Sequence, residues 1–92
     1  MFLRILRRLR DDVRRGRYVV TLHADEEMYN DGLTLRDVES AILTGWIEER
    51  QRSGIPRQWK YRLCGFSSSG DKMEVIVKSS SAGVVVVTVY LL

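Results

Sequence analysis

Residues 58–92, QWKYRLCGFSSSGDKMEVIVKSSSAGVVVVTVYLL, decide the fold class because they predict three consecutive strands. Residues 58–66 alternate between apolar and polar side chains, which is the period of a strand with one buried face. The apolar face carries Trp59, Tyr61 and Leu63, and the other face carries Lys60, Arg62 and Cys64. Turn-forming residues at 67–71 and 79–83 separate the three strands, so we expect them to form an antiparallel meander.

The two later strands differ in pattern. Met73, Val75 and Val77 alternate onto one face, whereas residues 84–92 form an apolar, β-branched run. Such a run is typical of a central strand that is covered on both faces. Thr88 and Tyr90 share one face of this strand, and hydroxyls inside an apolar run need hydrogen-bond partners. We therefore expect neighbouring groups to hold both hydroxyls.

The first half of the chain predicts helices and one short strand. Apolar residues recur at helical spacing in residues 2–15, with arginines between them, and predict an amphipathic helix that ends at Gly16. Residues 17–22, RYVVTL, predict a strand. A short helix over 24–29 follows and is closed by the Asn30-Asp31-Gly32 turn, which places His23 at its N-terminal end.

Thr34 and Asp37 form a capping-box-like start for another helix, which ends at Gly45. Residues 46–51 predict a strand before a turn at 53–56. This order indicates an α+β fold in which the N-terminal helices pack on a three- to four-stranded, mainly antiparallel sheet. A chain of 92 residues forms one domain, 1–92, with an amphipathic helix at 1–16 and a core at 17–92.

Charge is distributed unevenly along the chain, whose net charge is +3. Residues 1–17 contain seven arginines and two aspartates, residues 24–50 contain eight acidic and two basic side chains, and residues 51–92 are basic again. Basic flanks fit a phosphate-bearing partner, but a solvated surface is the commoner explanation of such charge on a small domain.

Several classes of protein are disfavoured by the composition. The single cysteine, Cys64, can form neither an intramolecular disulfide nor a cysteine-based zinc site, which fits a cytoplasmic location. The most apolar run, 84–92, is much shorter than the roughly 20 residues of a membrane-spanning helix. P-loop, dinucleotide-binding and zinc-protease motifs do not occur. We expect no membrane partner, no cofactor and no metal.

Two groups of residues are candidates for chemistry. His23, the single histidine, is the natural side chain to move a proton near neutral pH, and it also fits a structural histidine at a helix start. Lys60 and Arg62 share a strand face and either bind a phosphate or are solvated. Trp59 and Tyr61, on the opposite face, are predicted to lie in the core rather than to stack on bases.

Four segments together resemble the DUF4258 family of small bacterial proteins. They are YVVTLHADEEM at 18–28, DGLTLRDVESAILTGWIEE at 31–49, YRLCG at 61–65 and VVVVTVYLL at 84–92. The resemblance covers residues 18–92, so the core at 17–92 is DUF4258-like. The residues that it marks are His23, Ala24, Gly32, Gly45, Gly65, Thr88 and Tyr90.

The family is grouped with RelE-like or MqsR-like toxins, so the resemblance implies a RelE-like fold and a metal-independent endoribonuclease that is the toxin of a toxin–antitoxin pair. It marks His23, Tyr90 and Thr88 as the catalytic candidates. Lys60 and Arg62, which the resemblance does not mark, are the expected partners of the RNA phosphate because they share a strand face. The implied partners are RNA, either on the ribosome or as free mRNA, and a cognate antitoxin of the zinc-finger type that masks the basic face.

Two other interpretations stay open. The family commonly has arginine just before the methionine of the His-Ala helix, where this chain has Glu27, and a carboxylate cannot replace a guanidinium on phosphate. Glu27 therefore favours a non-catalytic protein-interaction module that retains the toxin-like fold. The arginine-rich helix at 1–16 also fits docking on a membrane surface or a ribosome, or simple packing on the sheet.

Overall fold

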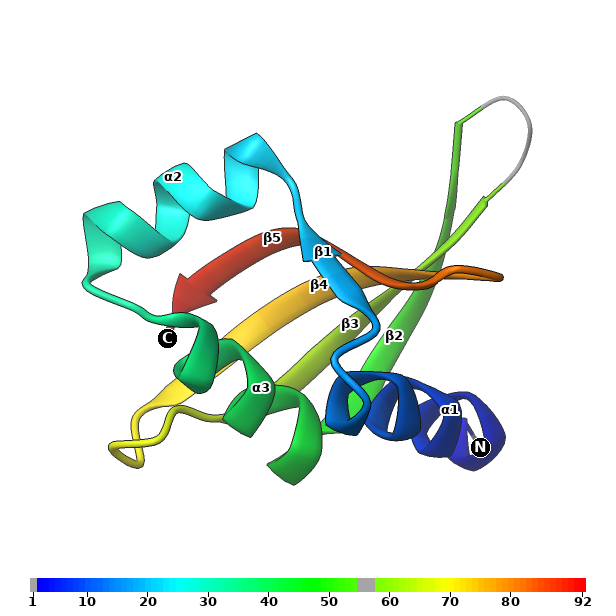
Figure 1. Ribbon diagram of the computed structural model, residues 1–92, viewed down its shortest axis with the longest axis horizontal. Helices are drawn as coiled ribbons and strands as arrows, with labels where there is room; N and C mark the ends of the chain where they lie inside the picture. The colour runs from blue at the N-terminus through cyan, green and yellow to red at the C-terminus, as the bar shows by residue number, and fades with distance from the viewer. Residues whose placement is uncertain (1, 55–57) are drawn as a thin grey trace.

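A mixed sheet forms the centre of the computed structural model, which describes residues 2–54 and 58–92 (Figure 1). The elements are α1 (Leu3–Arg14), β1 (Tyr18–Val20), α2 (Leu22–Asp31), α3 (Leu35–Thr44), β2 (Trp46–Ser53), β3 (Gln58–Phe66), β4 (Lys72–Ser80) and β5 (Gly83–Leu91). The strand order is β1-β5-β4-β3-β2, so β2 to β5 form the predicted antiparallel meander. The turn predicted at 53–56 lies partly outside the described residues.

The prediction of three to four strands was wrong because the first strand joins the sheet. β1 pairs in parallel with β5, from Tyr18 opposite Val84 to Val20 opposite Val86. The sheet therefore has five strands and is mixed. β5 lies between β1 and β4, as expected of an apolar run, but the helices cover only one of its faces. Its other face, which includes Thr88 and Tyr90, is half-buried.

Helix α2 begins two residues earlier than predicted because Thr21 caps it. The Thr21 hydroxyl accepts the Ala24 N–H at 3.1 Å, which satisfies one of the free amides of the first turn. The preceding strand consequently ends at Val20, and His23 lies within the first turn of the helix. Gly32 ends α2 in the left-handed conformation, with a φ of 67°.

The predicted capping box at the start of α3 is confirmed. Asp37 Oδ2 accepts the Thr34 N–H at 2.9 Å, and the Thr34 hydroxyl accepts the Asp37 N–H at 3.3 Å. Asp37 Oδ1 also accepts the Ser68 N–H at 3.0 Å and the Ser68 hydroxyl at 2.5 Å. These bonds, led by the Ser68 hydroxyl, lower the pKa of Asp37 to about 2. One carboxylate thus ties α3 to the turn between β3 and β4.

A single hydrophobic cluster joins the three described helices to one face of the sheet. Its fully buried members include Leu9, Val38, Ile42, Leu63, Met73, Val75 and Val89. Gly65 allows α3 to approach β3 closely, because a Cβ at this position would lie 2.1 Å from the carbonyl oxygen of Ala41. None of the described helices is both long and apolar enough to cross a membrane.

In the part of the chain that the structure describes, the opposite face of the sheet carries no helix, and we call it the helix-free face. Alternation and register place on it Lys60, Arg62, Cys64, Glu74, Ile76, Lys78, Thr88 and Tyr90. Four of the five predicted site residues therefore share one face, and only His23 comes from a helix.

Candidate functional site

Tyr90, Glu74 and Arg62 form a hydrogen-bonded row across three strands of the helix-free face. The Tyr90 hydroxyl donates to Glu74 Oε1 at 2.6 Å, and Arg62 Nη1 donates to Glu74 Oε2 at 2.8 Å. Glu74 is only 6% exposed, so a hydroxyl and a guanidinium, rather than water, satisfy its carboxylate. The prediction that a neighbour holds the Tyr90 hydroxyl is confirmed.

Two further carboxylates reach Arg62 from β2. Arg62 Nη2 donates to Glu49 Oε2 at 3.0 Å, and Nη1 lies 3.5 Å from Glu48 Oε2. The register of β2 and β3 shifts between Ile47 and Glu49, which brings two consecutive glutamates to the same guanidinium. In a regular strand they would point to opposite faces. Arg62 is therefore surrounded by three carboxylates.

Hydrogen bonding sets the ionisation of this row. The bond to Glu74, followed by burial, raises the pKa of Tyr90, so the phenol keeps its proton at neutral pH. The bond to Glu74 likewise raises the pKa of Arg62. Bonds from Gln51 and then from Arg62 lower the pKa of Glu49, which keeps that carboxylate ionised.

Lys60 lies farther along the same face, directly opposite Lys78 of β4. Side chains that oppose each other in an antiparallel pair have Cβ atoms about 4.5–5.5 Å apart, so the two like charges repel. Among the described residues, neither ammonium has a carboxylate within ion-pair distance. The lysine pair is thus open to an anion, whereas the guanidinium of Arg62 is already engaged.

His23 lies beside the sheet edge with its side chain 67% exposed. Its Nε2 is 3.3 Å from Glu27 Oε1, one helical turn away. The same oxygen accepts the N–H of Val89 in β5 at 3.1 Å. One carboxylate oxygen therefore links the imidazole to the strand that carries Thr88 and Tyr90.

Helix α2 closes the edge of β5 beyond the end of β1. Asp31 Oδ2 accepts the Leu91 N–H at 3.3 Å, as Glu27 accepts that of Val89. Alternate amides of a strand point to the same edge, and residues four apart share one side of a helix, so the two spacings match. Glu27 thus has a partner in the sheet as well as in His23.

The structure connects some of the predicted site residues and separates others. Tyr90 and Arg62 meet through Glu74, and Thr88 shares their face, opposite Ile76. Within the described residues, no hydrogen-bond partner is present for the Thr88 hydroxyl, and neither His23 nor Lys60 is hydrogen-bonded to Tyr90. No three His, Cys, Asp or Glu side chains of the described residues gather closely enough to hold a metal ion.

Glu74 and Lys78 were not among the predicted site residues. Alternation along β4 places both on the polar face, which is a signal that sequence alone contains. Only the register shows that Glu74 faces Tyr90 and that Lys78 faces Lys60.

The chain matches the sequence model of one protein family. A family model described as "Domain of unknown function (DUF4258)" matches residues 20–91. The chain belongs to the DUF4258 family. No curated protein and no solved structure matches it. The DUF4258 match runs from the end of β1 through β5, so it contains His23 and the helix-free face, while α1 lies outside it.

Proposed function

We propose that this DUF4258 protein is a toxin-type, metal-independent endoribonuclease. The observation that supports the proposal best is the Glu27 oxygen that joins an exposed His23 to the strand of Thr88 and Tyr90. RNA carries its own nucleophile, the 2′-hydroxyl. Cleavage therefore needs only a proton acceptor, a proton donor and stabilisation of charge on the phosphate.

In this proposal, His23 accepts the proton of the 2′-hydroxyl as the oxygen attacks the adjacent phosphorus. The bond to the 5′ oxygen breaks, and Tyr90 gives its proton to that leaving oxygen. The products are a 2′,3′-cyclic phosphate and a 5′-hydroxyl. Glu27 orients the imidazole and stabilises the imidazolium, as the carboxylate of a catalytic triad does.

The hydrogen bond to Glu74 raises the pKa of Tyr90, so the phenol is protonated at neutral pH and takes the part of proton donor in this proposal, not that of proton acceptor. Thr88 lies on the same face, and its hydroxyl, which has no hydrogen-bond partner within the described residues, orients the phosphate. Lys60, together with Lys78, stabilises the phosphate charge, a role for which the enclosed Arg62 is less suited.

A RelE-like form of the α+β fold belongs to the same proposal. Helices on one side of the sheet and an open opposite face support it, because the open face leaves room for RNA. The proposed substrate is mRNA, free or on the ribosome. The proposed antitoxin, of the zinc-finger type, inhibits the protein by covering its basic surface.

The test compares the protein with its His23→Ala variant, by induction in bacteria and by incubation of the purified proteins with RNA in EDTA. We expect growth arrest and cyclic-phosphate products from the parent protein, and cleavage about 10²- to 10⁴-fold slower from the variant. The exposed Asp25, in the same helix, provides a matched control as Asp25→Ala. Because His23 is largely exposed, its loss leaves the fold intact. Equal cleavage rates for the parent and His23→Ala would refute the proposed chemistry.

A non-catalytic interaction module is the second candidate. The three carboxylates around Arg62 favour it, because they neutralise the strongest cation of the helix-free face. This candidate predicts that the parent protein leaves RNA intact in the same assay and that induction does not stop growth.

A further inference from the structure

The two hairpins of the sheet separate beyond Lys60 and Lys78. β3 pairs with β4 as far as these two lysines. Past them, residues 58–59 pair only with β2 and residues 79–80 pair only with β5. Figure 1 shows the β2–β3 hairpin turning away from the β4–β5 hairpin. A cleft of about 570 Å³, which we call the hairpin fork, lies between them and is bordered by α1.

An aromatic wall on β3 lines one side of the fork. The prediction that Trp59 lies in the core was wrong, because the β3–β4 ladder ends at the neighbouring Lys60 and Trp59 is 38% exposed. Tyr61, which still pairs with β4, is buried as predicted. The guanidinium carbons of Arg50 and Arg52 lie 3.9 and 4.9 Å from the centre of the Trp59 ring.

These two arginines remain available to an anion. A guanidinium that lies over an aromatic ring still presents N–H groups at its edge. Among the described residues, neither Arg50 nor Arg52 forms an ion pair with a carboxylate. The wall therefore combines a flat aromatic surface with two free positive charges.

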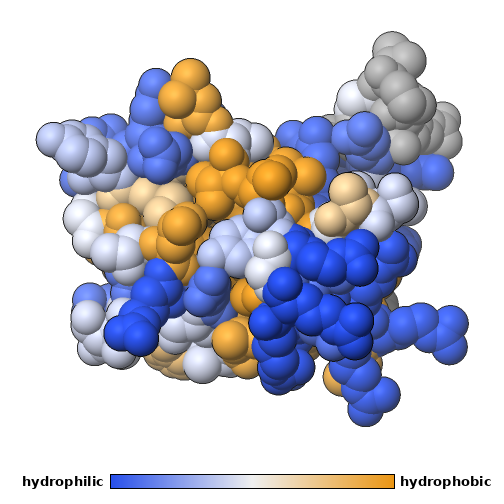
Figure 2. Space-filling view, viewed as in Figure 1, coloured by the Kyte–Doolittle hydropathy of each residue, from blue (hydrophilic) through white to orange (hydrophobic). Residues whose placement is uncertain are grey.

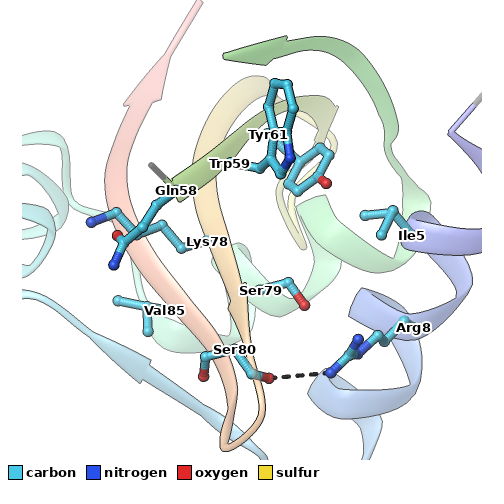
Figure 3. Close-up of a pocket in the computed structure, with 9 residues that line it drawn as sticks. All are labelled: Ile5, Arg8, Gln58, Trp59, Tyr61, Lys78, Ser79, Ser80 and Val85. Atoms are coloured by element: carbon cyan, nitrogen blue, oxygen red, sulfur yellow. Dashed lines mark hydrogen bonds between the residues drawn. The ribbon is translucent and has the colours of Figure 1, made fainter. Parts of the chain in front are cut away.

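The other walls of the fork are basic and polar. Arg8 reaches from α1 across the fork and donates to the Ser80 carbonyl oxygen at 3.4 Å (Figure 3). The Ser79 hydroxyl is buried and has no hydrogen-bond partner among the described residues. Lys78 extends away from α1, so cations stand on both sides of the fork. None of the described residues that line the fork is acidic.

A wider basic surface adjoins the fork. Hydrophilic side chains gather over α1 in the space-filling view (Figure 2), and seven arginines lie within residues 1–17. A positively charged surface attracts a polyanion and guides it toward a cleft. The fork is thus the place where the basic helix meets an exposed aromatic ring.

We propose that the hairpin fork binds a single-stranded segment of RNA. One base stacks on the Trp59 ring in place of a guanidinium that lies over it, and the flanking phosphates lie against Arg8 and the Lys60–Lys78 pair. Only an unpaired base can reach a ring inside a cleft, which selects single strands over duplexes. The choice of RNA rests on the proposed ribonuclease function, whereas binding itself requires no cleavage.

The two tryptophans of the chain allow a direct test. In Trp46→Phe, all tryptophan emission comes from Trp59, and oligouridylate should quench it as a base stacks. In Trp59→Phe, emission comes from Trp46, which is 43% exposed near Phe66, away from the fork, and it should not respond. Both titrations use His23→Ala protein so that the RNA stays intact. Equal quenching of the two tryptophans, or none of Trp59, would overturn the proposal.

Affinity and its salt dependence give a second measurement. Trp59→Leu, which keeps apolar bulk but has no ring, should weaken binding of labelled oligouridylate by about 5-fold or more, while Trp46→Leu should not. Thermal melting confirms that both variants fold. Arg8→Gln should reduce the slope of log K against log salt by about 0.7, the value for one phosphate contact to a single strand. Arg14→Gln, on the same helix but not in the fork, is its control.

The outcomes separate this inference from the proposed function. Quenching of Trp59 without RNA cleavage supports the fork and refutes the ribonuclease. Cleavage without quenching supports the ribonuclease and refutes the fork. Duplex RNA or anionic vesicles that bind as tightly as oligouridylate, whether or not Trp59 is replaced, would show a basic helix surface in place of a single-strand site.

Discussion

Replacing Asp37 with asparagine should lower the free energy of unfolding by about 2 kcal/mol at neutral pH. The ionised carboxylate accepts four hydrogen bonds, two from Thr34 and two from Ser68, and its pKa falls from an ordinary 3.8 to about 2. At about 1.4 kcal/mol per pKa unit, the folded state favours the ionised form by about 2 kcal/mol. Asparagine resembles the neutral acid and loses this preference.

The pH dependence follows from the direction of the shift. Because the pKa of Asp37 is lower in the folded than in the unfolded chain, its stabilisation is complete above about pH 4 and disappears as the pH falls toward about 2. Urea unfolding, followed by circular dichroism across this range, should show the parent and Asp37→Asn converging at low pH. Asp71→Asn, an exposed carboxylate in the same turn, is the control. A difference that persists below about pH 2, or that is no larger than for Asp71→Asn, contradicts the reasoning.

Two further variants test the site and the packing. Glu74→Gln should lower the pKa of Tyr90 toward its ordinary 10, seen as earlier tyrosinate absorbance, while Tyr18, whose pKa is raised to about 12, should not change. Gly65→Ala should destabilise the fold by about 3 kcal/mol or more because its Cβ would meet the α3 backbone. At Gly70 an added Cβ would meet no atom, and only the φ of +87° disfavours a side chain. Gly70→Ala should therefore lower the free energy of unfolding by only about 1 kcal/mol. Equal melting temperatures for the two glycine variants would contradict the packing argument.

Local signals in the sequence predicted the local structure well. The Thr34 and Asp37 pair started α3 as expected, and the alternation of residues 58–66 placed each side chain of β3 on its observed face. Both signals depend on neighbours a few residues apart. Pairing across the chain left no such signal, which is why the parallel partner of β1 was missed.

Burial was harder to predict than alternation. Trp59 and Tyr61 have the same pattern and point to the same side of β3, yet only Tyr61 is buried. The difference arises because the β3–β4 ladder ends at Lys60. Sequence alone does not show at which residue the pairing between two neighbouring hairpins ends.

The sequence predicted several residues of the candidate site, but it did not predict which of them are hydrogen-bonded to each other. Tyr90 and Arg62 were identified, but their shared partner Glu74 depends on register. The register shift that brings Glu48 and Glu49 together at Arg62 has no local sequence mark either. These connections decide which cations are free, and hence how RNA is expected to bind.

The position of β5 has a consequence for synthesis of the protein. This strand, at residues 83–91, contacts β1, β4, α1 and α2. In a nascent chain that has not reached residue 83, β1 has no strand to pair with. The carboxylates of Glu27 and Asp31 in α2 also lack the β5 N–H groups that they accept in the folded protein. Contacts between such distant segments form slowly because the intervening chain must close into a loop first. Stalled or truncated chains should therefore remain open to proteases, and the closed sheet edge and the hairpin fork should appear together, in one late step.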